Sequence, residues 1–458
     1  MTPELAEDGA LRAGAYHVDT TPELGAELGG YFQPRIADVV ERPLEAKALA
    51  LQSGDTTLLL ISCDILMMRA ADIVDEAKAR ITAATGVPAS HILVSATHTH
   101  SGPATVERVG GVRVDPAYIA RLTTAIAEAG IGATERLTPA RLGFGQAPVS
   151  GVCFNRRFLR TDGLVQFNPG RNRTDLVGPA GPTDPTVTGL VVEQTDGTPL
   201  AFWANLSLHY VNAGSPTAIS SDYYGAFAER LAGLYGGTVP AQLTNGCSGD
   251  INNVDLAGSV PEQGVLRAEM VASAVVGAAL AGTMMAERHT RVELSSQLLE
   301  VELDRASATE EDARIAAEIA AGQRKDAPFS WHRGMPIPED LVPYYAQRFT
   351  DLAARPERAT VPVTIMTIGE LCIVGLPGEI FVEHGLAIRH GSRYRHTAVV
   401  GLANDHIGYV PTARGHAQGG YESWRDGVSW TTVGSGERLV AAVLAEISDS
   451  GSGDRLAG

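Results

Sequence analysis

Two histidines separated by one residue form the most informative pattern in the chain. His98 and His100 lie in the stretch THTHSGP over residues 97–103, directly after the apolar run 91–96. If the extended conformation of that run continues, side chains two residues apart project from the same face. The end of a strand is also where α/β sheets commonly bind ligands. Such a pair gives a zinc ion one ligand and leaves the second imidazole for proton transfer, or it forms a hydrogen-bonded structural pair.

Other polar side chains also follow apolar runs that are typical of strands. His209 follows the run 200–208, and Glu379 and Tyr409 follow two later runs. This arrangement is expected if one rim of a sheet carries a site. Each residue has a structural alternative, because Glu379 suits the first turn of a helix and Tyr409 suits the edge of a core.

Two further polar segments contain residues of types that can take part in catalysis. The turn GCSGDINN at 246–253 is not a nucleophile elbow of the form G-x-S-x-G, because the glycine after Ser248 comes one place early. Asp222, in the stretch SSDYYG, either orients a site residue or caps the helix that follows.

The elements that must position these residues indicate an α/β fold. Short apolar runs are interspersed with longer helical stretches, which predicts a mixed β-sheet core with flanking helices. The predicted strands are 58–62, 91–96, 188–193, 200–208, 241–244, 361–368, 372–376 and 397–402. The predicted helices are 70–85, 117–129, 223–234, 266–286, 310–321, 343–354 and 437–447.

The whole chain, 1–458, is predicted to form a single compact catalytic domain. Two long segments, 170–188 and 325–343, interrupt the pattern, but both contain arginines or aromatic residues and lead directly into regular elements. We therefore expect loops here rather than interdomain linkers. The stretch 329–333 (FSWHR) either covers a pocket or forms a surface excursion.

Composition and charge restrict the partners and the compartment. The 458 residues carry a net charge of −17, which disfavours nucleic acid as a partner. The four cysteines include no CxxC pair, and the start of the chain, 1–14, shows no signal peptide, so we expect a cytoplasmic protein with reduced thiols. The uncharged runs 197–221 and 270–286 are expected to be strand with loop and a buried helix, not membrane spans.

Taken together, these stretches resemble the catalytic domain of the neutral (alkaline, non-lysosomal) ceramidase family. The matching pieces follow the family order over nearly the whole chain, and the THTHSGP string is the most specific single piece. They are VDTTP at 18–22, GGY at 29–31, THTHSGP at 97–103, NR at 155–156, His209, SD at 221–222, GD at 249–250, PGE at 377–379, Tyr409 and YE at 421–422.

The resemblance implies a zinc site and a reaction centre. The implied zinc ligands are His98, His209, Glu379 and Tyr409. The implied residues of the reaction centre are His100 as proton shuttle, Arg156 and Tyr421 as stabilisers of the developing oxyanion, and Asp250 from the matching GD pair. In such a site zinc lowers the pKa of a bound water molecule and polarises the scissile carbonyl.

This sequence departs from the family pattern at the nucleophile. The family's catalytic serine lies in GDVSPN, whereas this chain has GDINN, so Asn252 stands in the serine's place. An amide can donate or accept a hydrogen bond but cannot act as the same nucleophile. We therefore expect a zinc-activated water to attack directly, with Asn252 orienting the substrate or the water. We expect neither the family's C-terminal β-sandwich nor its secretion signal in this protein.

The sequence thus predicts a zinc-dependent hydrolase that cleaves an amide bond, or an ester or lactone bond, in a small molecule. Two alternatives stay open at this point. The same zinc ion could serve acyl transfer, cyclisation or elimination, or the protein could be a zinc-stabilised binding protein without catalysis. The presence of His100, Arg156 and Tyr421 favours the enzyme, because a structural zinc needs no proton shuttle.

Overall fold

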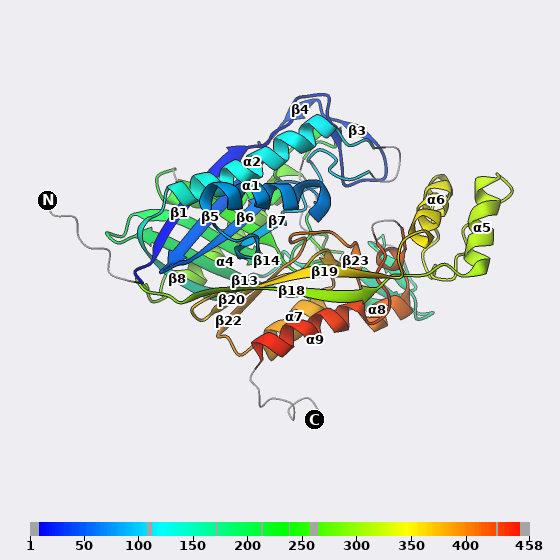
Figure 1. Ribbon diagram of the computed structural model, residues 1–458. Coiled ribbons are helices and arrows are strands. Elements are labelled where there is room, and N and C mark those ends of the chain that lie inside the picture. The colour runs from blue at the N-terminus through cyan, green and yellow to red at the C-terminus, as the bar shows by residue number, and fades with distance from the viewer. Residues whose placement is uncertain are drawn as a thin grey trace.

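Two β-sheets form the centre of the protein, and helices cover their outer faces (Figure 1). The computed structural model describes residues 9–107, 112–170, 173–211, 214–237, 239–256, 264–426 and 429–448. The first sheet has the strand order β16-β14-β13-β8-β1-β5-β6-β7, and the second has the order β18-β19-β20-β22. The mixed α/β class predicted from the sequence is therefore confirmed.

The strands of the two sheets have the following bounds. In the first sheet they are β1 (Arg12–Asp19), β5 (Glu45–Ser53), β6 (Thr56–Cys63), β7 (Ile92–Ala96), β8 (Thr138–Pro148), β13 (Thr186–Gln194), β14 (Pro199–Leu206) and β16 (Ala241–Asn245). In the second they are β18 (Leu294–Asp304), β19 (Arg358–Ile368), β20 (Leu371–Gly375) and β22 (His396–Val400).

Strand β5 shows why the sheets stack. Its alanines, among them Ala46 and Ala48, pack in the core beneath the helices, whereas Leu49 and Leu51 pack in the core between the two sheets. Successive side chains of a strand point to opposite faces, so a strand buried on both faces needs apolar residues at every position. Small residues on one face and large ones on the other let the helices approach closely.

Three pairs of helices complete the layers. Helices α1 (Asp75–Thr85) and α2 (Pro116–Glu135) cover one end of the first sheet, and α3 (Asp222–Leu234) and α4 (Val265–Thr283) cover the other end. Helices α7 (Val382–Gly391) and α9 (Ser435–Ile447) cover the second sheet. All of the helices predicted from the sequence appear, with ends shifted by a few residues.

Helix α4 is long and apolar enough to cross a membrane by length and composition alone. It packs against α3, β8 and β13, and its buried side chains, such as Val271 and Val275, belong to the core of that layer. These contacts agree with the buried helix predicted for this segment. All four cysteines are free thiols. The cytoplasmic location itself stays a prediction, and residues 1–8 of the start examined for a signal peptide lie outside the described residues.

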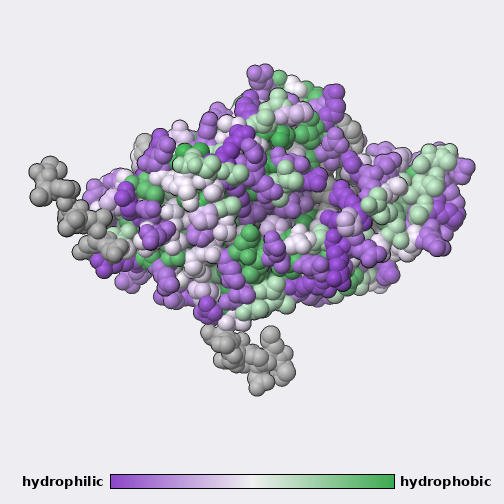
Figure 2. All heavy atoms as spheres, viewed as in Figure 1, coloured by the Kyte–Doolittle hydropathy of each residue, from purple (hydrophilic) through white to green (hydrophobic). Residues whose placement is uncertain are grey.

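A helical lobe stands apart from the sandwich. Helices α5 (Glu310–Ala320) and α6 (Val342–Ala353) project from the end of the second sheet (Figure 1) and share a small core that includes Phe329 and Trp331. Figure 2 shows a mainly hydrophilic surface on the face drawn, with a notch in the outline between this lobe and the main body. The predicted long loop at 325–343 is therefore the connection inside the lobe, and its aromatic residues are buried.

The first sheet curls so strongly that its two edges meet. Strand β16 contacts β6 and β7 although it lies at the opposite edge, and Gln242 Nε2 donates to the Leu60 carbonyl at 3.4 Å. The loop after β22 adds to the same place, because Asn404 bonds with both its backbone N–H and its side chain to Val94 of β7. Loops from distant parts of the chain are thus brought to one cavity.

Candidate active site

A cavity of about 310 Å³ lies where these loops meet. Most of the predicted site residues line it: His98, His100, Arg156, His209, Asn252, Tyr409 and Tyr421. Its other lining residues are Gly30, Tyr31, Phe32, Phe167, Asn168 and Val211. The residues predicted to follow strands do so in the structure, since His98 follows β7, His209 follows β14 and Tyr409 follows β22.

His98 reaches the cavity through an unusual backbone conformation. The expectation that the extended conformation continues past β7 is wrong, because His98 has φ of 71°. Left-handed backbone is uncommon for a residue other than glycine and is often retained at functional sites. The histidine pair nevertheless meets in space, with the ring centroids of His98 and His100 5.1 Å apart.

The proton of His98 is fixed by a backbone carbonyl. His98 Nδ1 donates to the Leu66 carbonyl at 2.7 Å, so the lone pair of the neutral ring lies on Nε2. That nitrogen lies 3.4 Å from Glu379 Oε2. A lone pair and a carboxylate oxygen that face each other need a proton or a metal ion between them. An Nδ1–H bonded to a carbonyl is also the usual support of a metal-binding histidine.

Glu379 is a buried carboxylate that lacks hydrogen bonds. It is 4% exposed, and neither of its oxygens has a hydrogen-bond partner within the described part of the chain. Burial raises the pKa of Glu379, but the nearby imidazoles of His98 and His406 outweigh burial and hold that pKa well below its usual range. A buried anion of this kind is costly unless a cation completes it.

Tyr409 is held beside Glu379 by a short pair of strands. Strands β21 (Glu379–Ile380) and β23 (Tyr409–Val410) pair in parallel, with Glu379 opposite Tyr409. The close approach requires Gly378, which has φ of 131° and where a Cβ would lie 2.7 Å from the Gly408 carbonyl oxygen. The PGE stretch therefore positions both predicted ligands together.

His209 completes a cluster of three buried histidines. One ring nitrogen from each of His98, His100 and His209 lies within 4.8 Å of the others, an arrangement that could hold a metal ion. The Nε2 atoms of His100 and His209 are 2.8 Å apart. Burial, together with the nearby His98 and Arg156, holds the pKa of His209 well below its usual value, so the ring is neutral.

Hydrogen bonds to Glu422 and His209 hold Arg156 through two of its three nitrogen atoms. Its Nε donates to Glu422 Oε1 at 2.8 Å, and its Nη1 faces His209 Nδ1 at 2.6 Å. Because Arg156 donates to Nδ1, the proton of neutral His209 lies on Nε2, and a cation bound at Nε2 would displace it. Arg156 Nη2 is buried and has no hydrogen-bond partner among the described residues. This N–H₂ group can donate to an oxyanion at the cavity wall.

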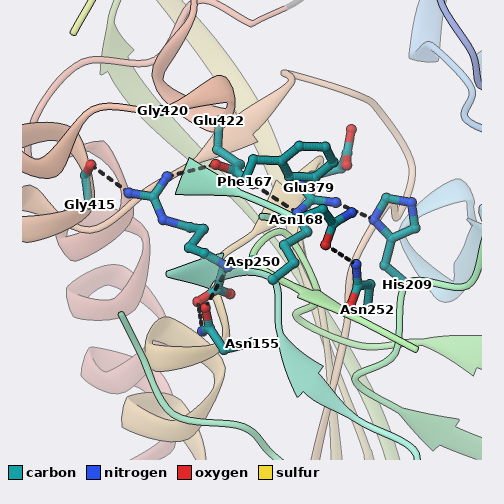
Figure 3. A network of polar contacts seen from close by, with 12 residues as sticks. Asn155, Phe167, Asn168, His209, Asp250, Asn252, Glu379, Gly415, Gly420 and Glu422 are labelled. Carbon is teal, nitrogen blue, oxygen red and sulfur yellow. Dashed lines mark hydrogen bonds and ion pairs between the residues drawn. The ribbon is translucent and has the colours of Figure 1, made fainter. Parts of the chain in front are cut away.

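Glu422 holds two arginines in place, as Figure 3 shows from close by. Its second oxygen accepts from Arg157 Nη1 at 2.7 Å, and Arg157 Nη2 donates to the carbonyls of Gly415 and Gly419 at 3.0 and 2.9 Å. Burial raises the pKa of Glu422, but the positive charges of Arg156 and Arg157 outweigh it and lower that pKa. Glu422 is therefore ionised and fixes the guanidinium of Arg156.

Asn252 has a fixed amide orientation. Its Oδ1 accepts from the backbone N–H of Val254 at 3.0 Å, and its Nδ2 donates to Asn168 Oδ1 at 2.7 Å (Figure 3). Because a backbone N–H can only donate, the oxygen must face Val254 and the NH₂ group must face Asn168. Asn252 therefore brings a hydrogen-bond donor to the cavity wall, where the ceramidase pattern has a hydroxyl.

Asp250 lies behind the cavity wall and does not line it. Its Oδ1 accepts from the Val382 N–H at the start of α7 at 2.8 Å, and its Oδ2 accepts from Asn155 Nδ2 at 2.9 Å (Figure 3). Its backbone carbonyl accepts from the Arg156 N–H at 2.8 Å. Burial raises the pKa of Asp250 to about 6. The structure places this predicted catalytic residue as a support for the strand that carries Arg156.

Asp222 orients the histidine loop. Its Oδ2 accepts from the Thr99 hydroxyl at 2.6 Å and from the His100 N–H at 3.3 Å. It is the first residue of α3, and Ser221 occupies the N-cap position. Of the two readings of Asp222 from sequence, orientation of a site residue is confirmed and helix capping is wrong.

Several residues in or beside the cavity had no role in the predictions from sequence. They are Gly30, Tyr31, Phe32, Phe167, Asn168, Val211, His406 and Glu422. His406 Nε2 lies 3.5 Å from Glu379 Oε1 and so supports the carboxylate from the side opposite His98. The only indication of His406 in the sequence was its position three residues before the predicted ligand Tyr409. Glu422 lay inside the matching YE pair, but nothing in the sequence indicated a bridge to two arginines.

The fold matches solved structures. No protein-family profile matches the sequence, and no curated protein sequence matches it. The crystal structure of neutral ceramidase from Pseudomonas aeruginosa superposes with a TM-score of 0.71 and 19% identity, over 96% of this chain and 74% of that chain. A structure of ceramidase complexed with C2 gives a TM-score of 0.70 and 18% identity, over 96% and 75%. This chain has the neutral ceramidase fold.

Proposed function

We propose that this protein is a zinc-dependent hydrolase that cleaves an amide bond, or an ester or lactone bond, in a small molecule. The observation that carries the proposal is the buried carboxylate of Glu379, whose two oxygens lack hydrogen bonds and lie 3.4 Å from His98 Nε2 and 3.5 Å from His406 Nε2. The Glu379 carboxylate and the His98 imidazole are both suitable ligands for a cation. Two solved structures that share this fold are of ceramidases, which supports hydrolysis of an amide bond.

The residues that would hold the metal are His98, His209, Glu379 and Tyr409. A zinc ion bound there would polarise a carbonyl group and lower the pKa of a water molecule. Nitrogen and carboxylate ligands of this kind suit zinc.

The residues of the chain supply the remaining chemistry. His100 faces His209 across 2.8 Å and can take a proton and return it to the leaving group. Arg156 lines the cavity, and its buried Nη2 group would stabilise the negative charge that builds on the carbonyl oxygen. The rigid amide of Asn252 orients the substrate or the attacking water, since it cannot act as a nucleophile.

Metal analysis tests the zinc assignment. Freshly purified protein should contain about one zinc ion per chain, and dialysis against a chelator should remove both the zinc and the activity. Activity in a freshly purified protein that carries almost no zinc would contradict the metal assignment.

A substrate panel separates the enzyme from the binding protein. Amides, esters and lactones are assayed with wild type, with His100→Ala and with the control His390→Ala, which changes an exposed histidine at the end of α7. We expect His100→Ala to lose about 100-fold or more in rate and the control to keep the wild-type rate. Equal rates for wild type and His100→Ala on every substrate would favour a binding protein without catalysis.

A further inference from the structure

A second, larger cavity adjoins the one that holds the site residues. It has a volume of about 760 Å³ and lies between the segment 31–35, the segment 214–216 and residues 338–341 at the base of the α5–α6 lobe. We call it the outer cavity, and the cavity with the histidines the inner cavity.

Two aromatic residues form the wall between the cavities. Tyr31 and Phe32 line both. The ring of Tyr31 packs edge-on against His100 with centroids 5.4 Å apart, and the ring of Phe32 packs edge-on against Tyr421 at 5.7 Å. A substrate group that passes from one cavity to the other must therefore pass these two side chains.

The inner cavity is small and mainly aromatic. Its volume of about 310 Å³ lies at the lower end of the roughly 300 to 1,000 Å³ that is typical of small-molecule sites. Phe32, Phe167, Tyr409 and Tyr421 contribute rings to its wall. Such a space suits a compact apolar or aromatic group and is too small to enclose a long alkyl chain.

Polar side chains line the outer cavity, and hydrogen bonds fix part of its wall. Gln33, Arg35, Ser101, Ser215 and Asp340 line it. Arg35 Nη1 donates to the Pro216 carbonyl at 2.9 Å and Nη2 to the His100 carbonyl at 2.6 Å, and its guanidinium stacks over Tyr31 at 4.2 Å. The wall of the outer cavity is thus tied directly to the loop that carries His100.

We propose that the substrate spans both cavities, with a compact apolar group in the inner cavity and a polar group in the outer cavity. This inference rests on the proposed function for the position of the scissile bond, which lies beside His100. It assigns the substrate class as small amides or esters with one short apolar side and one polar side. Amides with long alkyl chains on both sides are excluded, because one chain would always fall on the inner side.

A panel of four amides tests the proposal on the zinc-loaded protein. The panel contains N-benzoylethanolamine, N-acetylethanolamine, N-hexadecanoylethanolamine and N-hexadecanoylsphingosine in detergent, and the released amine is measured. We expect the first two to be cleaved with a kcat/KM at least about tenfold above that of the last, because oversized groups fit packed sites poorly. A kcat/KM for N-hexadecanoylsphingosine equal to or above that of the short amides would overturn the proposal.

A variant of Phe32, in the wall between the two cavities, makes the test more specific. Phe32→Ala opens the wall between the cavities and should raise the kcat/KM ratio of the long-chain amide to N-benzoylethanolamine at least about fivefold. The control Met285→Ala changes a side chain that is 93% exposed near the end of α4 and should leave the ratio unchanged. An unchanged ratio in Phe32→Ala would contradict the assignment of Phe32 to the partition.

A binding measurement distinguishes failure of this inference from failure of the proposed function. If neither these amides nor the esters and lactones of the substrate panel are cleaved, the proposed function fails. The two cavities are then tested by calorimetric titration with N-benzoylethanolamine and N-hexadecanoylsphingosine. Binding of the short ligand that weakens in a variant with a filled inner cavity, Val211→Trp, supports the two-cavity assignment. Binding of the long-chain ligand alone, or of neither, overturns it.

Discussion

The two sides of the inner cavity differ in how their buried polar atoms are satisfied. On the side of Glu379, two carboxylate oxygens lack hydrogen bonds in the described part of the chain, and the His98 lone pair faces one of them. On the side of Arg156, the carboxylates of Glu422 and Asp250 each bind two donors. Both sides are buried to a similar degree, so exposure does not explain the difference.

The difference indicates what each side does. Burying a carboxylate without partners costs several kcal/mol, and native proteins retain such a group only where something else completes it. A carboxylate with all its partners in the chain holds its neighbours in a fixed geometry. We propose from this difference that the Glu379 side binds a cation, and that the Arg156 side is a rigid frame that presents a donor to the substrate.

The largest effect on rate is expected from Arg156→Lys. A lysine cannot bridge Glu422 and His209 and also present a donor to the cavity, so kcat should fall by about 100-fold to 1,000-fold with little change in zinc content. Arg160→Lys, on the partly exposed strand β10 (Arg157–Arg160), is the control and should keep the wild-type rate. A normal kcat in Arg156→Lys would show that the spare donor has no role.

Asn252→Ala should slow the reaction without abolishing it. Loss of one orienting hydrogen bond typically costs about 100-fold in rate, and the zinc content should not change. Ser248→Ala and Cys247→Ala are the matched controls, because neither residue lines the inner cavity and burial raises the pKa of the Cys247 thiol far above neutrality. Abolition of activity by Ser248→Ala, with zinc and folding intact, would identify Ser248 as the attacking group instead.

Glu422→Gln tests the frame itself. A glutamine can accept from one arginine but presents its NH₂ group to the other, so Arg156 loses its fixed position. We expect kcat to fall about tenfold with KM nearly unchanged, and the free energy of unfolding to fall by about 3 kcal/mol. Glu422→Asp keeps the charge and should recover part of kcat. A KM effect without a kcat effect would assign Glu422 to substrate binding.

The last expected effect is a pH dependence of the free energy of unfolding that arises from Asp250. Its pKa is raised from 3.8 to about 6 in the folded protein, so the folded state binds more protons than the unfolded state between these values. The contribution of this group to stability is therefore complete below about pH 4 and is lost as pH rises through about 6, on the order of 3 kcal/mol in total.

Urea unfolding of wild type and Asp250→Asn at pH 4, 5, 6 and 7 measures this contribution. The advantage of wild type over the variant should shrink as pH rises. An advantage that grows with pH would mean that Asp250 is ionised more easily in the folded protein, and the frame would then be held by charge attraction rather than by hydrogen bonds alone.

The sequence predicted the loops that carry the proposed zinc ligands better than it predicted the buried contacts that support Arg156. Runs such as 91–96 and 200–208 are apolar on both faces, which marks a buried strand, and the polar residue after each strand was the signal for the site. Strand β5 was missed because its small alanines and its lysine weaken that signal, although both faces are buried. Helix positions were predicted well because their apolar periodicity is long and repeated.

The remaining features depend on contacts between distant segments. The left-handed backbone of His98 is held by hydrogen bonds from its loop to Ile65 and Leu66, more than thirty residues away. The bridge from Glu422 to Arg156 joins residues separated by 266 positions. Asp250 occupies the family's GD position, yet only its contacts with Asn155 and Val382 show that it supports the wall from behind.

Zinc binding by the chelator-treated protein tests the central claim most directly. Wild type, Glu379→Gln and the control Glu370→Gln, which changes an exposed glutamate, are titrated with zinc by calorimetry while thermal unfolding is followed in parallel. We predict one tight site in wild type and in Glu370→Gln, a rise in Tm on zinc addition to both, and at least about 100-fold weaker binding in Glu379→Gln. Equal zinc affinity in Glu379→Gln and wild type would contradict the claim that this buried carboxylate is completed by a metal ion.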